Sequence, residues 1–204
     1  MQSELLFKEA PVWQAVGTLV GPSVLSVLVM VIYSMTDLFF IGLLKDTAQT
    51  AAVSVVGPVF TLASAGATVL GMGGCAVVAN SLGAGDRQDA RCVSSLCGWC
   101  ALLTGTFLAV VLNLFCEPIL YMLGTNAEIL PYATHYLRIL ALGAPAMIFS
   151  VSAASLLRAD GAIRRGLAGN LAGSITNILL DPLFILIFGW NIAGAAAATM
   201  LGNL

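Results

Sequence analysis

Two pairs of polar residues interrupt apolar stretches of this chain at the spacing of one helical turn. Tyr33 precedes Asp37 by four positions, and Asn177 precedes Asp181 by the same interval, so each pair shares one face of a helix. Asp181 lies in the middle of the apolar run 169–189. A carboxylate at the centre of a bilayer helix costs about 2.5–3.5 kcal/mol on insertion scales. Ordinary folding gives no reason to accept that cost, so Asp181 is a candidate for function.

Asp37 and Asp181 would form a site for a proton or a cation if their helices meet. Two carboxylates in a low-dielectric site cannot both remain bare anions, so one takes up a proton or a cation binds between them. Pro182 has no N–H group to donate to the carbonyl of Ile178, which leaves a main-chain oxygen beside the carboxylates. Such an oxygen-rich set suits a hard cation. Asp37 could instead cap its helix at the membrane interface, and the sequence favours neither interpretation.

The composition indicates an all-α, polytopic membrane protein. Hydrophobic residues make up 59% of the chain, charged residues 9%, and the mean hydropathy is +0.99, which is far from the usage of soluble domains. A span needs about 20 apolar residues. We therefore expect five complete transmembrane helices and the start of a sixth. The predicted spans are about 12–36, 51–79, 93–116, 130–157, 167–188 and 192–204, and the last suggests a lobe cut within its sixth helix.

The basic residues predict the orientation of these spans. Six of the eight Lys and Arg residues fall on one side of the expected membrane, which places the N-terminus and the loops 83–91 and 158–165 in the cytoplasm by the positive-inside rule. No basic stripe is present that would bind nucleic acid. The six cytoplasmic residues are Lys8, Arg87, Arg91, Arg158, Arg164 and Arg165, and the other two are Lys45 and Arg138.

Three further residues or groups have local roles. Pro22 should bend the first helix and could act as a hinge. Thr125 or Asn126 should cap the fourth helix, which we expect to start near Glu128. His135 lies in the first turns of that helix, where a structural role is more common than a role in proton relay.

Several motifs in order resemble the N-terminal lobe of the multidrug and toxic compound extrusion (MATE) transporters, and most of all their DinF-like branch. They are Gly21-Pro22, Thr36-Asp37 followed by Phe-Phe-Ile-Gly42, Leu82-Gly-Ala-Gly-Asp86, Leu157-Arg-Ala-Asp-Gly161 and Asn177-Ile-Leu-Leu-Asp181-Pro182. The resemblance runs from about Pro11 to the end of the chain.

The resemblance implies a lobe of six helices that pairs with a second lobe, absent from this chain, around a central cleft. It implies export of small organic, often cationic, drugs across the plasma (cell inner) membrane, driven by Na⁺ or H⁺ and without a cofactor. The matching positions place the cation site, and any Na⁺, at Asp37, Asn177, Asp181 and Thr199. Tyr33 would line that site, and Pro22 would be the bending proline.

Other functions stay open on the sequence alone. A lipid-linked oligosaccharide flippase of the same superfamily is the nearest alternative, but such proteins usually carry basic residues in the cavity, and no predicted span has Lys or Arg at mid-depth. An intramembrane aspartyl protease would use two Asp residues as an acid/base dyad, although Thr-Asp-Leu and Leu-Asp-Pro do not match its motifs. We therefore expect a transporter rather than an enzyme. An inactive half-transporter is the remaining alternative.

Overall fold

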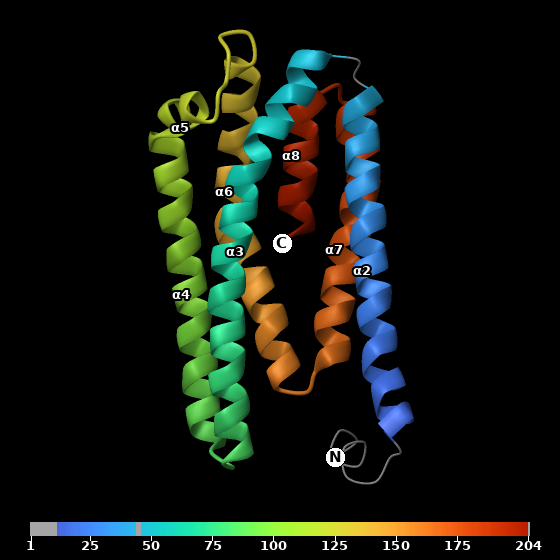
Figure 1. The fold of residues 1–204 in the computed structure, drawn as a ribbon, viewed down its shortest axis with the longest axis vertical. Coiled ribbons are helices and arrows are strands. Elements are labelled where there is room, and N and C mark those ends of the chain that lie inside the picture. The colour runs from blue at the N-terminus through green and yellow to red at the C-terminus, as the bar shows by residue number, and fades with distance from the viewer. Residues whose placement is uncertain (1–11, 44–45, 204) are drawn as a thin grey trace.

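The computed structural model describes residues 12–43 and 46–203, and these residues form helices joined by short turns, with no strand among them. The prediction of an all-α fold is thereby confirmed. Elements are numbered as in Figure 1. They are α2 (Val12–Leu43), α3 (Thr47–Gly83), α4 (Arg87–Leu114), α5 (Cys116–Met122), α6 (Leu130–Ala159), α7 (Ile163–Pro182), the π-helix η1 (Leu183–Ile187) and α8 (Asn191–Gly202).

The long helices lie side by side in two groups (Figure 1). Helices α3, α4 and α6 pack against one another, and α2 packs mainly against α7, which in turn packs against α8. Helix α6 joins the two groups because it contacts both α7 and α8. Although α2 and α3 are consecutive in the chain, they make few contacts with each other. The two groups therefore diverge along the α2 and α3 side.

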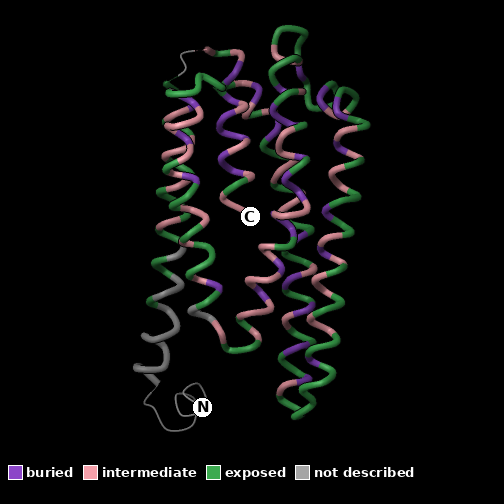
Figure 2. Tube along the Cα trace, turned by 180° about the vertical axis from the view of Figure 1, so that it is seen from behind, coloured by how far each residue is buried: buried purple, intermediate pink, exposed green. Residues whose placement is uncertain are grey.

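The outer surface of this bundle is apolar, as expected in a lipid environment. Large hydrophobic side chains such as Leu62 and Phe107 are exposed, while buried positions concentrate on α6, α8 and the helix faces around them (Figure 2). Helices α3, α4 and α6 are each long and apolar enough to cross a membrane, and residues 27–43 of α2 form a shorter apolar helix. Each predicted span overlaps a helix, although α4 ends at Leu114, η1 at Ile187 and α8 at Gly202, and the number of spans stays a prediction.

Glycines allow α6 to approach its two partners closely. A Cβ atom added at Gly105 of α4 would lie 2.5 Å from the Cα of Pro145 in α6, and one added at Gly71 of α3 would lie 2.9 Å from the Ser155 hydroxyl. Neither neighbour could move away without shifting the backbone of α6 or its buried serine. These two glycines therefore set the spacing between the helices.

The predicted cap of the fourth long helix is wrong. Helix α6 begins at Leu130, its N-cap is Ile129, and no side chain caps it. The Thr125 hydroxyl instead donates to the carbonyl of Leu120 at 2.6 Å. Leu120 lies near the end of the short helix α5, where the last carbonyl groups have no N–H partner within the helix and need another donor. Asn126 contributes only its main-chain carbonyl, which accepts from Leu130.

A change of helix type and a tight turn bring the last helix back along α7. The α-helical part of α7 ends at Pro182, and the π-helix η1 follows. Gly189 then has a φ of 65° and Asn191 a φ of 50°, both in the left-handed region that glycine and asparagine accept most easily. The chain reverses there, so α8 returns beside α7 and α6.

Candidate cation site and adjoining cavity

Helices α2, α7 and α8 bring together the polar residues that the sequence singled out. Asp181 has no exposed surface, Asn177 is 2% exposed, Thr199 is 8% exposed, and Asp37 is partly buried. Helix α2, which carries Asp37, packs against α7, which carries Asp181. The expected meeting of the first and fifth predicted spans therefore occurs, although their role as a cation site stays a prediction.

Small residues allow α8 to approach α7 closely enough to form this site. Gly173 of α7 faces Gly202 of α8 with no space for a Cβ atom at either position. Near the other end of α8, a Cβ at Gly194 would lie 2.9 Å from the main-chain carbon of Phe184 in η1. These two contacts fix α8 along its length, and Thr199 lies between them.

One hydrogen bond joins the two helices inside the site. The Asn177 side-chain amide donates to the Thr199 hydroxyl at 3.3 Å. The Asn203 side chain donates to the carbonyl of Thr199 at 2.7 Å, which fixes the last turn of α8. Because Asn177 uses its N–H group on Thr199, its amide oxygen is oriented away from that bond.

The site contains buried oxygens that lack hydrogen-bond donors. Within the described part of the chain, Oδ1 of Asp37, Oδ1 of Asn177 and both carboxylate oxygens of Asp181 are buried and accept no hydrogen bond. An uncompensated buried carboxylate is costly. A proton, or a hard cation that prefers oxygen ligands, would compensate these groups. No cluster of three or more His, Cys, Asp or Glu side chains suited to a metal ion occurs among the described residues.

Two tyrosines lie beside the carboxylates. Tyr33, one turn before Asp37 on α2, is partly buried, as its predicted site-lining position requires. Tyr136 of α6 is 6% exposed and belongs to the same buried cluster as Ile41, one turn after Asp37, and Ile185, one turn after Asp181. The sequence reasoning missed Tyr136 and considered its neighbour His135 instead. An aromatic residue with a hydroxyl inside a predicted span was the available signal, since buried tyrosines usually need a hydrogen-bond partner.

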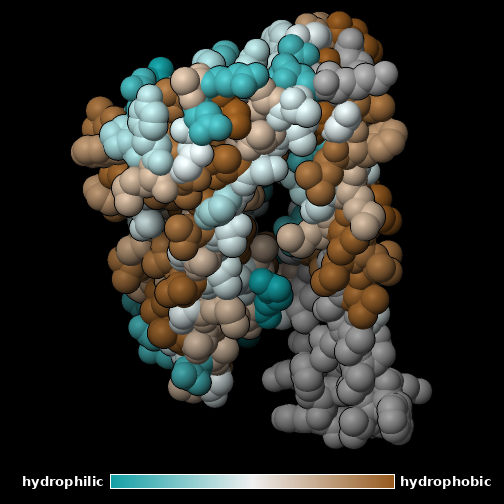
Figure 3. All heavy atoms as spheres, turned by 45° about the horizontal axis from the view of Figure 1, so that its top comes forward, coloured by the Kyte–Doolittle hydropathy of each residue, from teal (hydrophilic) through white to brown (hydrophobic). Residues whose placement is uncertain are grey.

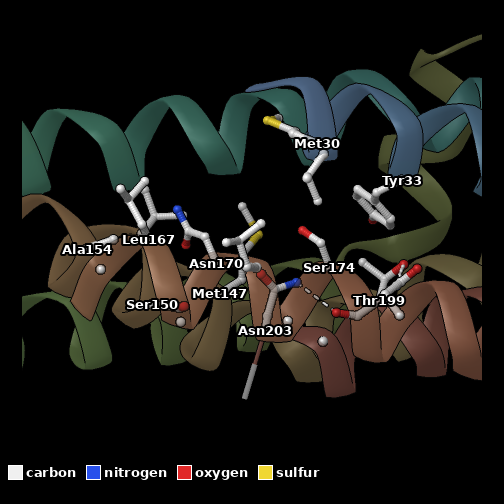
Figure 4. Close-up of a pocket in the computed structure, with 18 of the residues that line it drawn as sticks. Met30, Tyr33, Met147, Ser150, Ala154, Leu167, Asn170, Ser174, Thr199 and Asn203 are labelled. Carbon is white, nitrogen blue, oxygen red and sulfur yellow. Dashed lines mark hydrogen bonds between the residues drawn. The ribbon is translucent and has the colours of Figure 1, made fainter. Parts of the chain in front are cut away.

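A cavity of about 470 Å³ lies next to these residues, between the two groups of helices. We call Tyr33, Asp37, Asn177, Asp181 and Thr199 the carboxylate cluster. The cavity wall includes three of these residues, Tyr33, Asn177 and Thr199, whereas Asp37 and Asp181 lie one helical turn further on. Figure 4 shows Met30 and Tyr33 of α2 facing Ser174 and Thr199 across the cavity. In Figure 3 a cleft separates the two groups of helices. The cavity and the carboxylate cluster therefore share a wall.

The remaining predicted residues lie elsewhere. Pro22 falls within α2, which continues through it as one helix, while the surroundings of its side chain lie outside the described residues. His135 is exposed and lines a separate pocket with Glu117 and Arg138 at the start of α6. Arg158, which the sequence assigned only to a cytoplasmic loop, lines the cavity between the two groups of helices. Its distance from the carboxylates along the chain gave no signal of that position.

Comparison with known proteins points to one group of transporters. A family model described as MatE matches residues 22–183. The multidrug export protein MepA of Staphylococcus aureus is 31% identical over 198 residues, which is 97% of this chain. The protein of the same name from Staphylococcus saprophyticus is 29% identical over the same length. Each alignment covers 44% of the relative.

Solved structures give the same result. An outward-facing multidrug resistance MATE family transporter of the MOP superfamily matches with a TM-score of 0.85 at 29% identity, covering 89% of this chain and 40% of that one. An inward-facing structure of such a transporter matches with a TM-score of 0.79 at 30% identity, over 84% of this chain and 39% of that one. The chain thus spans less than half the length of the proteins that it resembles.

Proposed function

Because the chain belongs to the MatE family, we propose that it forms the ion-coupling lobe of a secondary transporter that exports drugs and organic cations. The coupling ion is Na⁺ or H⁺, and the transport cycle needs no other cofactor. Relatives named as multidrug export proteins support the substrate class. The lobe works in the plasma (cell inner) membrane, with its N-terminus in the cytoplasm and a second lobe completing the cleft.

One observation carries this proposal: the buried carboxylates and the cavity share the wall formed by Tyr33, Asn177 and Thr199. When Asp37 or Asp181 takes up a proton or a sodium ion, the negative charge behind that wall falls by one unit. A cationic drug in the cavity then loses electrostatic attraction, because Coulomb interactions act strongly through a low-dielectric interior. Ion uptake and drug release are thereby linked.

The contacts within the wall can convert this change of charge into a movement of the helices. Asn177 connects α7 to Thr199 of α8 through its amide hydrogen, and its amide oxygen is free to bind an ion. An ion bound by Asp37, Asp181 and Asn177 would draw α2 toward α7. Because α2 makes few contacts with α3, it can move relative to α3 without breaking a large interface. The cleft between the two groups of helices then changes shape.

The proposal is tested with the complete protein that the gene encodes, in everted membrane vesicles. Uptake of ethidium, a fluorescent cation, is measured under a sodium gradient alone and under a pH gradient alone. We expect uptake under one of these gradients, which identifies the coupling ion, and loss of that uptake in Asp181→Asn. Asp160→Asn is the matched control, since Asp160 is exposed in the turn between α6 and α7.

Either of two results would overturn the proposal. If Asp181→Asn transports like the wild type, the buried carboxylate does not couple ion and drug. If the wild type moves no dye under either gradient, then a lipid-linked oligosaccharide flippase or an inactive lobe explains the chain better.

A further inference from the structure

One charged side chain lies in the wall of the cavity between the two groups of helices. Arg158 is in the last turn of α6, and it is the only ionisable side chain other than Tyr33 among the described residues that line this cavity. The rest of the wall is apolar or uncharged, with polar groups such as Ser150, Ser174 and Asn170. A single guanidinium in such a wall is the strongest fixed charge that a ligand would meet there.

Among the described residues, one side chain anchors this guanidinium. Its Nη2 donates to the Ser155 hydroxyl at 3.0 Å. Ser155 is 3% exposed, donates in turn to the carbonyl of Val151 at 3.1 Å, and packs against Gly71 of α3. Arginine has five N–H donors, so one bond to a buried serine positions the head group and leaves donors for a ligand.

The cavity also has electrically different ends. Along α6 its wall extends from Met147 to Arg158, and along α7 from Gly166 to Asn177. Each stretch contains twelve residues, whose ends lie about 16 Å apart at the rise of an α-helix. Figure 4 shows Ala154 and Leu167 toward one end, and Tyr33 and Thr199 toward the other. Arg158 therefore lies at the end opposite to Asp37 and Asp181.

We infer that Arg158 binds the carboxylate of an exported zwitterionic drug whose cationic group points toward Asp37 and Asp181. This inference rests on the proposed export function and specifies its substrate class. A carboxylate can accept two parallel hydrogen bonds from a guanidinium, a geometry that adds affinity and orientation. A purely cationic drug gains nothing at Arg158 and is repelled by its charge. The cavity thereby distinguishes zwitterions from simple cations of similar shape.

A matched pair of dyes tests this directly. Rhodamine 110 carries a carboxylate, and rhodamine 123 is its methyl ester, so the two differ mainly in that group. Their binding to the purified full-length protein in lipid nanodiscs is measured by fluorescence polarisation at pH 7.5. In Arg158→Gln we expect rhodamine 110 to bind about tenfold more weakly, the loss typical of a hydrogen bond to a charged group. The dissociation constant for rhodamine 123 should change less than about twofold or decrease.

Two further variants separate specific binding from general effects. Arg158→Lys keeps the charge but not the planar fork, so its affinity for rhodamine 110 should lie between those of the wild type and Arg158→Gln. Arg165→Gln removes a basic residue that is exposed at the start of α7 and absent from the cavity wall, and it should bind both dyes normally.

The outcomes distinguish this inference from the export proposal. Equal weakening of both dyes in Arg158→Gln, or no change in either, would overturn the role of Arg158 while the wild type still binds and exports cations. Failure of the wild type to bind either dye would count against the drug cavity itself, and the inference would fall with it.

Discussion

The Asn177 amide donates to the Thr199 hydroxyl at 3.3 Å and so connects α7 to α8 through two buried side chains. The same bond orients the Asn177 amide oxygen, which is buried and accepts no hydrogen bond among the described residues. Asp181 lies one helical turn further along α7. This single interaction therefore both holds two helices together and prepares an oxygen ligand beside a carboxylate.

Replacing Thr199 by valine should destabilise the protein. The substitution keeps the shape but leaves the buried Asn177 amide without an acceptor, which costs about 1–3 kcal/mol. Thermal unfolding of the full-length protein in detergent measures this loss. The control is Thr176→Val, because Thr176 is exposed on α7 and its replacement should change stability by less than about 0.5 kcal/mol. Similar melting temperatures for the two variants would argue against the bond.

Asp181→Asn should be more stable than the wild type in buffer without Na⁺ at alkaline pH. The wild type then holds an uncompensated buried anion, and removing it should stabilise the protein by at least about 1 kcal/mol. The variant should also lose any stabilisation that the coupling ion gives the wild type. Thermal melts with sodium chloride or choline chloride, each over a range of pH, check both expectations. A variant that is less stable than the wild type in every buffer would show that the carboxylate has partners of its own.

Gly105→Ala should loosen the contact between α4 and α6. The added methyl group would lie 2.5 Å from the Cα of Pro145, and overpacking of this kind costs about 1–3 kcal/mol. The control is Gly98→Ala in the same helix, where the nearest atom is a Phe149 ring carbon at an ordinary 3.6 Å. There the better helix propensity of alanine should stabilise by up to about 1 kcal/mol. Equal effects on the midpoint of unfolding would refute close packing at Gly105.

The contribution of Asp46 to stability should depend on pH. Its carboxylate caps α3 by accepting hydrogen bonds from the Gln49 side chain and from the N–H groups of Ala48 and Gln49. The Gln49 side chain, followed by these main-chain donors, holds the pKa of Asp46 below its usual value. A folded-state pKa below the unfolded one gives stability that is fully present above the unfolded pKa, near 4, and is lost as the pH falls through the folded pKa.

Asp46→Ala should therefore melt at a lower temperature than the wild type at pH 7. Part of that difference should disappear as the pH falls below about 4, the usual range of an aspartate pKa, and the loss is complete once the wild-type cap is protonated at its lower folded-state pKa. Asp160→Asn provides a control in an exposed turn. If the difference between Asp46→Ala and the wild type stayed constant from pH 7 to pH 3, the ionised cap would not be its source.

The sequence predicted this architecture well where local spacing determined the result. The pairs Tyr33/Asp37 and Asn177/Asp181 share helix faces because four residues make about one turn, and the cost of burying a carboxylate in an apolar span was enough to single out Asp181. The all-α fold followed from composition in the same way. Thr199 was identified only through family resemblance, since nothing in the alanine-rich stretch around it suggests a site.

The missed features depend on contacts between distant parts of the chain. Tyr136 and Arg158 belong to the site and the cavity because α6 faces α7 and α8, and neither residue is near Asp181 in sequence. Thr125 was assigned to the wrong helix because the short helix α5 was not expected, and its own end competed for that hydroxyl. The π-helix after Pro182 likewise has no sequence signal beyond the proline.

Reciprocal binding measures the coupling between the carboxylate cluster and the cavity most directly. The affinity of the full-length protein in nanodiscs for rhodamine 123 is determined as a function of Na⁺ at fixed pH, and of pH without Na⁺. We predict that one ion weakens dye binding, that the dye weakens binding of that ion by the same factor, and that Asp181→Asn abolishes both effects. Dye affinity that is independent of both ions in the wild type would contradict the account.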